Sequence, residues 1–310
     1  MPKRLFSEKG ESSVIEKRTP SRLVFNVFNY GFMIIFALLC IMPVWHVVMA
    51  SLSNPRLLMG ASGILVKPLG KVTLEGYGMV LQNRNILVGY GNTIFYVLFT
   101  SVFGTILTAI AGYLVSRTDF KLAKPLTLFI MFTMIFSAGT IPTYMVIRNM
   151  GMLNTRWAIL VPGLMNTYYI IIMKSAFEQL PMSFEESAKL DGANSLTILF
   201  KILMPMVKPT LAVVVMFTVI MQWNSWYLAS IYLVKARDKW PLQLFMRDLL
   251  VKNDASKIVT NANDANAAIN MAGNLVKYCV TVVGTAPILL AYPFAQKYFV
   301  SGITLGGVKG

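Results

Sequence analysis

Long apolar segments constrain the fold of this sequence more than any other feature. Six of them lie at about 23–51, 92–116, 125–147, 157–177, 210–234 and 275–299. Each approaches or exceeds the roughly 20 residues that an α-helix needs to cross the hydrocarbon core of a bilayer. Because a spanning segment must satisfy its own backbone hydrogen bonds, these segments predict an all-α membrane protein with about six transmembrane helices.

The composition supports the same fold class. Of 310 residues, 56% are hydrophobic and 13% are charged, whereas a soluble domain has about 25% charged residues. The net charge of +15 does not indicate nucleic-acid binding, because the basic residues lie between apolar segments and no nucleic-acid motif is present. Lys and Arg are spread almost evenly over the two sets of connections and favour a cytoplasmic N-terminus only slightly.

Few residues could carry catalysis or bind a metal. Cys40 and Cys279 lie in apolar segments without metal or redox spacing, so both are predicted to be small buried residues. His46 is the only histidine and is expected to have a structural role or to make a hydrogen bond in helix packing. Because the sequence lacks a phosphate-binding loop, a nucleophile elbow and a zinc-binding histidine pair, we predict no catalytic residue, no metal site and no cofactor bound by this chain.

The polar segment between the fourth and fifth apolar segments predicts a helix–turn–helix. Ser183 and Glu186 have the spacing of a capping box, and Gly192 is placed to end the first helix in a left-handed conformation. A second helix is predicted to begin at Asn194 or Ser195 and to stop at Pro205. The first helix is too short to be stable alone. It either docks into a partner protein or folds back as a surface loop, and the pattern leaves both possibilities open.

The residues of this loop resemble the signature of ATP-binding-cassette (ABC) importer permeases. That signature reads E-A-A, three residues, G, nine residues and I-x-L-P, and the matching positions here are Glu186-Ser187-Ala188, Gly192 and Ile202 to Pro205. Ser187 and Met204 are the two departures from it. The triplet Asp191-Gly192-Ala193 is typical of the branch that imports sugars.

Other segments extend the resemblance over nearly the whole chain. They are Asn92-Thr93, Gly112 to Arg117, Ile141 to Tyr144, Gly151 to Thr155 and the final Gly306 to Gly310. On these residues the chain is identified as a member of the maltose-type sugar importer permeases, closest to the branch for complex oligosaccharides. The resemblance implies the MetI-like fold of type I ABC importers.

The resemblance also implies a domain organisation, a location and a set of partners. A cytoplasmic tail over 1–22 would precede a permease domain over 23–302 with a coupling loop at 181–205, and a cytoplasmic tail over 303–310 would follow. The chain would lie in the bacterial cytoplasmic membrane with both termini inside. The implied partners are a second homologous permease subunit, two cytoplasmic ABC ATPases that bind ATP and Mg²⁺, and an extracellular sugar-binding protein.

The family pattern assigns two groups of residues to contact with the ATPase. The coupling positions are Glu185, Glu186, Ser187, Ala188, Asp191, Gly192, Ala193 and Pro205. The tail residues Gly306, Gly307 and Lys309 resemble a tail that reaches between the two ATPases, and the alternative is a frayed terminus.

Polar and aromatic residues at membrane depth are candidates for a sugar path. One set is Gln222, Trp223, Asn224, Trp226 and Tyr227, and a second set includes Asn166 and Tyr168. Because the fifth apolar segment is predicted to be a helix, Trp223, Trp226 and Tyr227 are expected to share a face. The alternative interpretation is that the aromatic residues lie at a membrane interface and the amides bond across helices.

Three other functions compete with sugar import. The chain could be an ABC permease for a solute other than a sugar, and only the loop triplet and the tail separate these two functions. An ion-coupled transporter is less favoured, because the sequence has neither repeated halves nor carboxylates within the apolar segments. A membrane-embedded enzyme is disfavoured by the lack of a nucleophile or an acid–base set within these segments.

Overall fold

The computed structural model describes residues 20–251 and 266–307, and every regular element in these ranges is a helix. The longest helices are α1 (Pro20–Ser51), α4 (Arg84–Phe99), α5 (Thr105–Ser116), α9 (Thr167–Glu178), α13 (Lys208–Trp223) and α16 (Asn266–Gly307). The other helices before residue 166 are α2 (Pro55–Met59), α3 (Glu75–Gln82), α6 (Ala123–Ile135), α7 (Thr140–Asn149) and α8 (Trp157–Gly163). Those beyond α13 are α14 (Tyr227–Tyr232), the 3₁₀ turn η3 (Arg237–Lys239) and α15 (Leu242–Val251).

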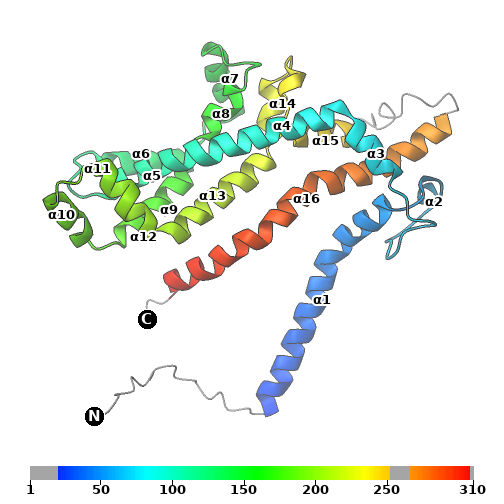
Figure 1. Ribbon diagram of the computed structural model, residues 1–310, viewed down its shortest axis with the longest axis horizontal. Helices are drawn as coiled ribbons and strands as arrows, with labels where there is room; N and C mark the ends of the chain where they lie inside the picture. Colours follow the sequence, from blue (N-terminus) through cyan, green and yellow to red (C-terminus); the bar gives the residue numbers. More distant parts are fainter. Residues whose placement is uncertain (1–19, 252–265, 308–310) are drawn as a thin grey trace, which may run out of the picture.

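Helices α4 and α5 are joined by the π-helical segment η1 (Thr100–Gly104) and run the length of the bundle. Helix α9 packs along α5, α13 contacts both of them, and α16 packs against α13 (Figure 1). Gly112 permits the close approach of α5 and α9, because a Cβ atom there would lie 2.7 Å from the Cβ of Met173.

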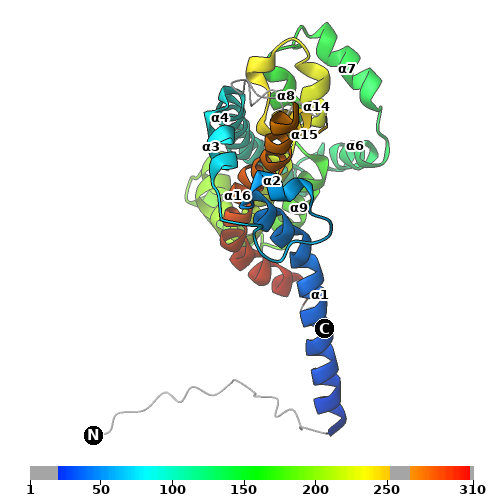
Figure 2. The ribbon, with the colours of Figure 1, turned by 90° about the vertical axis from the view of Figure 1, so that its right-hand side faces the viewer.

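Helix α1 stands away from this bundle in both views (Figures 1 and 2). Of its residues, only Ala50 and Ser51 are buried, and its contacts with the bundle are made near this end. A helix that is apolar on all sides needs lipid or another protein around it. Cys40 is therefore exposed, contrary to the prediction, whereas Cys279 is buried as predicted. His46 does make a packing hydrogen bond, because its Nδ1 accepts from the Leu65 amide at 3.0 Å.

By length and composition, four helices could cross a membrane: Pro20–Ser51, Arg84–Ser116, Trp157–Glu178 and Gly273–Pro293. The number rises to six if each of two bent helix pairs counts as one span. The first pair, α6 and α7, is bent by 118°. Gly139, with φ +83°, lies at this bend, so the predicted 125–147 segment is not one straight helix.

The predicted 210–234 segment is also interrupted. Helix α13 ends at Trp223, and the chain adopts a non-helical conformation at Trp226 before α14 begins at Tyr227. At 16 residues, α13 alone is about 24 Å long at 1.5 Å per residue, which is shorter than a typical hydrocarbon core.

Candidate functional site

The segment between α9 and α13 forms the predicted helix–turn–helix at one end of the bundle (Figure 1). It consists of α10 (Ser183–Leu190), α11 (Ser195–Thr197), the π-helical segment η2 (Ile198–Leu203) and α12 (Met204–Met206). The apolar side chains of this segment pack with α5, α9 and the start of α13 in one core cluster, which includes Ala188 and Phe177.

The start of α10 differs from the predicted capping box. Met182 is the N-cap residue, and its carbonyl oxygen accepts from the Glu185 and Glu186 amides, both at 3.0 Å. The helix therefore begins one residue earlier than the box requires. Ser183 is the first helical residue, and no side chain caps the helix.

The end of α10 matches the prediction. Gly192 has φ +79°, a conformation that costs glycine little. Its amide donates to the Lys189 carbonyl at 3.1 Å, and the Ala193 amide donates to the Ala188 carbonyl at 2.9 Å. This pair of hydrogen bonds is a Schellman motif, which stops the helix and reverses the chain.

The second helix begins as predicted and ends later than predicted. The Asn194 side chain accepts from the Thr197 amide at 2.8 Å and caps the helix. Pro205 does not stop it, because it falls in the first turn of α12, where a missing N–H is tolerated. The chain instead bends by 90° at Val207, between α12 and α13.

A buried ion pair holds α10 against the end of α5. Glu185 is 2% exposed and Arg117 is 5% exposed. The Arg117 Nε and Glu185 Oε2 atoms lie 3.0 Å apart, and the Tyr113 hydroxyl donates to Glu185 Oε1 at 2.8 Å. The Arg117 guanidinium also lies 5.0 Å from the centre of the Tyr113 ring. The ion pair thus joins the loop at 181–205 to the Gly112 to Arg117 segment, two motifs that lie far apart in the sequence. It also shows that Glu185 faces the bundle.

Two exposed charges extend this network to the surface. Lys189 Nζ lies 3.3 Å from Glu185 Oε1 and 3.5 Å from Asp119 Oδ2. The hydrogen bond to Glu185 is the largest cause that raises the pKa of Lys189 above its usual value, and Asp119 adds to it. Lys189 therefore stays protonated and helps to compensate the buried carboxylate.

The opposite side of α10 and its turn is exposed and carries both apolar and acidic groups. Leu190 is 90% exposed and Phe184 is 45% exposed. Of the predicted coupling residues, Glu185 and Ala188 are buried against the bundle, and Ala193 is half-buried. The others are exposed: Glu186, Ser187, Asp191, Gly192 and Pro205. Leu190 and Phe184 thus leave apolar side chains on the same exposed surface as the carboxylates of Glu186 and Asp191.

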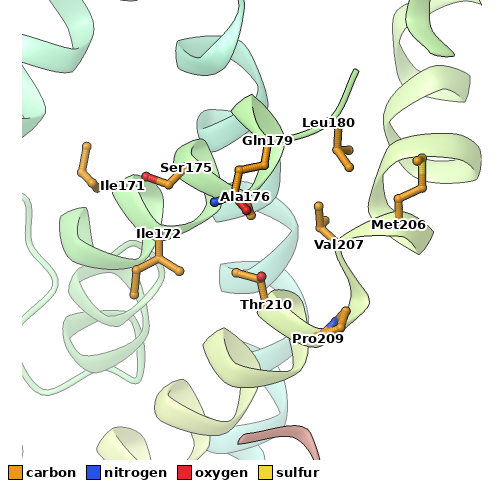
Figure 3. A pocket seen from close by; sticks show the side chains of 10 residues that line it. All are labelled: Ile171, Ile172, Ser175, Ala176, Gln179, Leu180, Met206, Val207, Pro209 and Thr210. Atoms are coloured by element: carbon orange, nitrogen blue, oxygen red, sulfur yellow. The ribbon is translucent and has the colours of Figure 1, made fainter. Parts of the chain in front are cut away.

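A cavity of about 500 Å³ lies beside this loop, between α9 and the bend that joins α12 to α13 (Figure 3). Its lining residues are Ile171, Ile172, Ser175, Ala176, Gln179, Leu180, Met206, Val207, Pro209 and Thr210. Because Val207 belongs both to the lining and to the 90° bend, any change of that angle would change the width of the cavity.

The residues predicted to line a sugar path fall into two environments. Gln222 and Trp223 are buried, and the Trp223 Nε1 donates to the Gly284 carbonyl at 3.1 Å. These two residues therefore pack among the helices of this chain, and a role in lining a sugar path stays a prediction for them. The predicted stripe of three aromatic residues does not form, because the helix ends at Trp223.

The remaining members of these sets lie at breaks between helices. Asn224 and Tyr227 are exposed and Trp226 is half-buried, just after α13. Asn166 caps α9 by accepting from the amide of the exposed Tyr168 at 2.9 Å. The two breaks are neighbours, because a Cβ atom at Gly163 would lie 3.3 Å from Gln222 Oε1.

The predicted tail residues lie at the end of α16. Gly306 and Gly307 are its last two residues, whereas Lys309 lies outside the described residues.

Comparison with known proteins supplies the context for this geometry. Residues 123–304 match the family model described as "Binding-protein-dependent transport system inner membrane component". The polygalacturonan/rhamnogalacturonan transport system permease protein YtcP of Bacillus subtilis (strain 168) is 34% identical over 93% of this chain and 99% of its own length. The galactooligosaccharides transport system permease protein GanQ of the same organism is 30% identical over 92% of this chain and 95% of its own length.

A solved structure is similar over the same extent. A chain of a bacterial ABC transporter involved in the import of the acidic polysaccharide alginate superposes with a TM-score of 0.81 and 31% identity. The match covers 91% of this chain and 98% of that chain. The fold with interrupted helices described above is therefore a fold that ABC importers use.

Proposed function

This chain belongs to the family of binding-protein-dependent transport system inner membrane components, the permeases of ABC importers, and we propose that it moves a carbohydrate into a bacterial cell with energy from a separate ATPase. The observation that carries the proposal is the two-sided arrangement of α10. Its inner side bonds to α5 through Glu185 and Arg117, while its outer side presents Glu186, Ser187 and Leu190. Such a helix can transmit a movement from a partner protein to the bundle.

Relatives support a carbohydrate cargo rather than another solute. The two permeases named above serve a polygalacturonan or rhamnogalacturonan and galactooligosaccharides, and the solved transporter imports alginate. An ion-coupled mechanism has less support. Among the described residues, the buried carboxylates are Glu185 and Asp248, and each is paired with an arginine, so neither offers a free site for a coupling ion.

In the proposed mechanism, ATP and Mg²⁺ bind to two partner ATPases, and this chain contributes the coupling surface. Glu186, Ser187 and Asp191 contact the ATPase, and Gly192 allows the turn that brings them together. Closure of the ATPases pulls α10, and the buried Glu185–Arg117 pair passes this movement to the end of α5. The Val207 bend allows α13 to change its angle to α12 during the same step.

The proposal includes an orientation and further partners. The α10 end faces the cytoplasm, so the start of α4 at Arg84 faces outward and receives a sugar-loaded binding protein. With six crossings, both termini lie in the cytoplasm, and Gly306, Gly307 and Lys309 contact the ATPases. A second homologous permease subunit covers apolar surface that this chain leaves exposed, including that of α1.

The test is co-purification from a membrane in mild detergent with the products of neighbouring genes. Wild-type chain is expected to retain a P-loop ATPase and a second permease. Gly192→Pro should insert into the membrane but lose the ATPase, because proline cannot adopt φ +79° and cannot donate to Lys189. Gly192→Asn is the matched control, since asparagine tolerates a left-handed backbone.

The opposite result would be a wild-type chain that purifies alone and transports solute into vesicles without ATP. In that case the α9–α13 loop would be a surface feature, and the importer function would be refuted.

A further inference from the structure

A cluster of two aromatic rings and one arginine lies far from α10, around the break between α13 and α14. Helix α15 carries the arginine and packs along α4, where the Leu242 amide donates to Thr93 Oγ1 at 2.8 Å. Helix α10 contacts the other end of the same continuous helix, at Tyr113 and Arg117. That helix has 33 residues and is about 50 Å long at 1.5 Å per residue. The cluster therefore belongs to the half of the bundle that the proposed orientation turns outward.

The three side chains form an ordered surface. The Arg247 guanidinium lies 4.3 Å from the centre of the Trp226 ring, and the Trp226 and Tyr227 rings meet edge to face at 5.7 Å. Trp226 is half-buried because it packs against the core cluster that contains Tyr232 and Leu233. Tyr227 and Arg247 are exposed. The packed Trp226 ring thus holds the exposed Arg247 guanidinium in a fixed position.

Arg247 differs from neighbouring cations in what it bonds to. Arg156 donates to Asn92 Oδ1 at 3.0 Å, Arg237 pairs with Asp248 at 3.1 Å, and Lys239 pairs with Asp238 at 3.2 Å. Within residues 20–251 and 266–307, Arg247 instead lies over the Trp226 ring and forms no ion pair. A guanidinium that lies over an aromatic ring can still bind a carboxylate through two hydrogen bonds from its N–H groups.

The exposed Tyr227 ring provides an apolar face on which a sugar ring can pack, and the guanidinium held over Trp226 adds a donor pair that fits a carboxylate. We infer that Arg247, Trp226 and Tyr227 form a binding site for an acidic saccharide, one whose sugar units carry carboxylates, as it enters the permease. This inference rests on the proposed carbohydrate function and specifies its substrate class. A neutral saccharide would pack on Tyr227 but would offer Arg247 only uncharged acceptors, which bind a guanidinium more weakly than a carboxylate does.

The test uses the complete importer, reconstituted in vesicles with its partner permease, ATPases and binding protein. The substrates are a galacturonate trisaccharide and its methyl ester, which lacks the charge and adds one methyl group to each carboxyl, each at a concentration that saturates the binding protein. We expect ATP-dependent uptake of the acid form to exceed that of the ester. Arg247→Gln should lower uptake of the acid form about tenfold and leave that of the ester unchanged, since a hydrogen bond to a charged group is worth about a factor of ten or more.

Two variants distinguish a specific loss of binding at this site from a general effect of charge or folding on uptake. Lys235→Gln removes an exposed cation from the same half of the molecule and should change neither substrate. Arg247→Lys keeps the charge but loses the paired donors, so its uptake of the acid form should be intermediate.

Equal loss of both substrates in Arg247→Gln would overturn the inference and indicate that Arg247 contacts the binding protein instead. Unchanged uptake of the acid form would also overturn it, while leaving the carbohydrate function intact. If the wild-type importer takes up neither these probes nor any neutral oligosaccharide, the carbohydrate function itself fails.

Discussion

At the scale of single residues, Glu185 has the clearest structural role. It is a carboxylate that is almost completely buried, and such a group is tolerated only when it is paired. Its partners Arg117 and Tyr113 both come from the end of α5, so the pairing fixes α10 to one particular helix. Its neighbour Glu186 points outward instead, although both residues lie in the first turn of α10.

This difference leads to a prediction for the two glutamates. Glu185→Ala should destabilise the chain by about 3–5 kcal/mol, because it leaves Arg117 as an unpaired buried charge. Glu186→Ala should change stability by less than about 0.5 kcal/mol, since its side chain is exposed. Thermal unfolding of the purified complex measures both effects.

A double substitution checks whether the pair itself is responsible. Glu185→Ala with Arg117→Ala should cost less than the sum of the two single changes, because neither charge is then left unpaired. Strict additivity of the three unfolding free energies would show that the two side chains do not interact.

At the scale of helices, local signals in the sequence predicted the loop well. The left-handed Gly192 and the Asn194 cap both depend on nearby backbone geometry, and both have the predicted roles. The predicted stop at Pro205 was wrong because proline is compatible with the first turn of a helix. The pairing of Glu185 with Arg117 joins residues 68 positions apart in the chain, and no local pattern encodes such a contact.

The fifth apolar segment shows the limit of apolar length as a signal. The length of 210–234 predicted one helix, and that helix would have aligned Trp223 with Trp226 and Tyr227. The structure instead interrupts it after Trp223, whose indole bonds to the Gly284 carbonyl of α16. Contacts with other helices, which sequence periodicity does not report, thus decide which aromatic residues are buried and which are exposed.

The packing of α5 against α9 gives a second prediction. Gly112→Ala should destabilise the bundle by about 1–3 kcal/mol, because its Cβ would lie 2.7 Å from the Cβ of Met173. Gly78→Ala is the control, since a Cβ there meets no atom within 4 Å. That change should be neutral or stabilise α3 by up to about 1 kcal/mol. Equal unfolding temperatures for the two variants would contradict the close packing of these helices.

At the scale of the whole molecule, the bundle and α1 form two unequal parts. The bundle has buried cores at both ends, whereas α1 leaves apolar side chains exposed along most of its length. Lipid or a partner must cover these side chains in the membrane.

The reactivity of the two cysteine thiols tests this arrangement of α1 and the bundle. In the chain purified in detergent, Cys40 should react with a small membrane-permeant maleimide, whereas Cys279 should react only after unfolding. The variants Cys40→Ser and Cys279→Ser assign each reaction to one thiol. Rapid labelling of Cys279 in the folded chain would contradict the packing of α16 in the bundle.

Site-specific photo-cross-linking in native membranes can show whether the outer side of α10 contacts an ATPase. A photoreactive residue at Leu190, which is 90% exposed, should cross-link to a P-loop ATPase. The same group at Ala188, which is 6% exposed in the core cluster with Phe177 and Ile198, should react within this chain. If Leu190 cross-links only to lipid or to its own chain while the importer hydrolyses ATP, α10 is not the coupling helix.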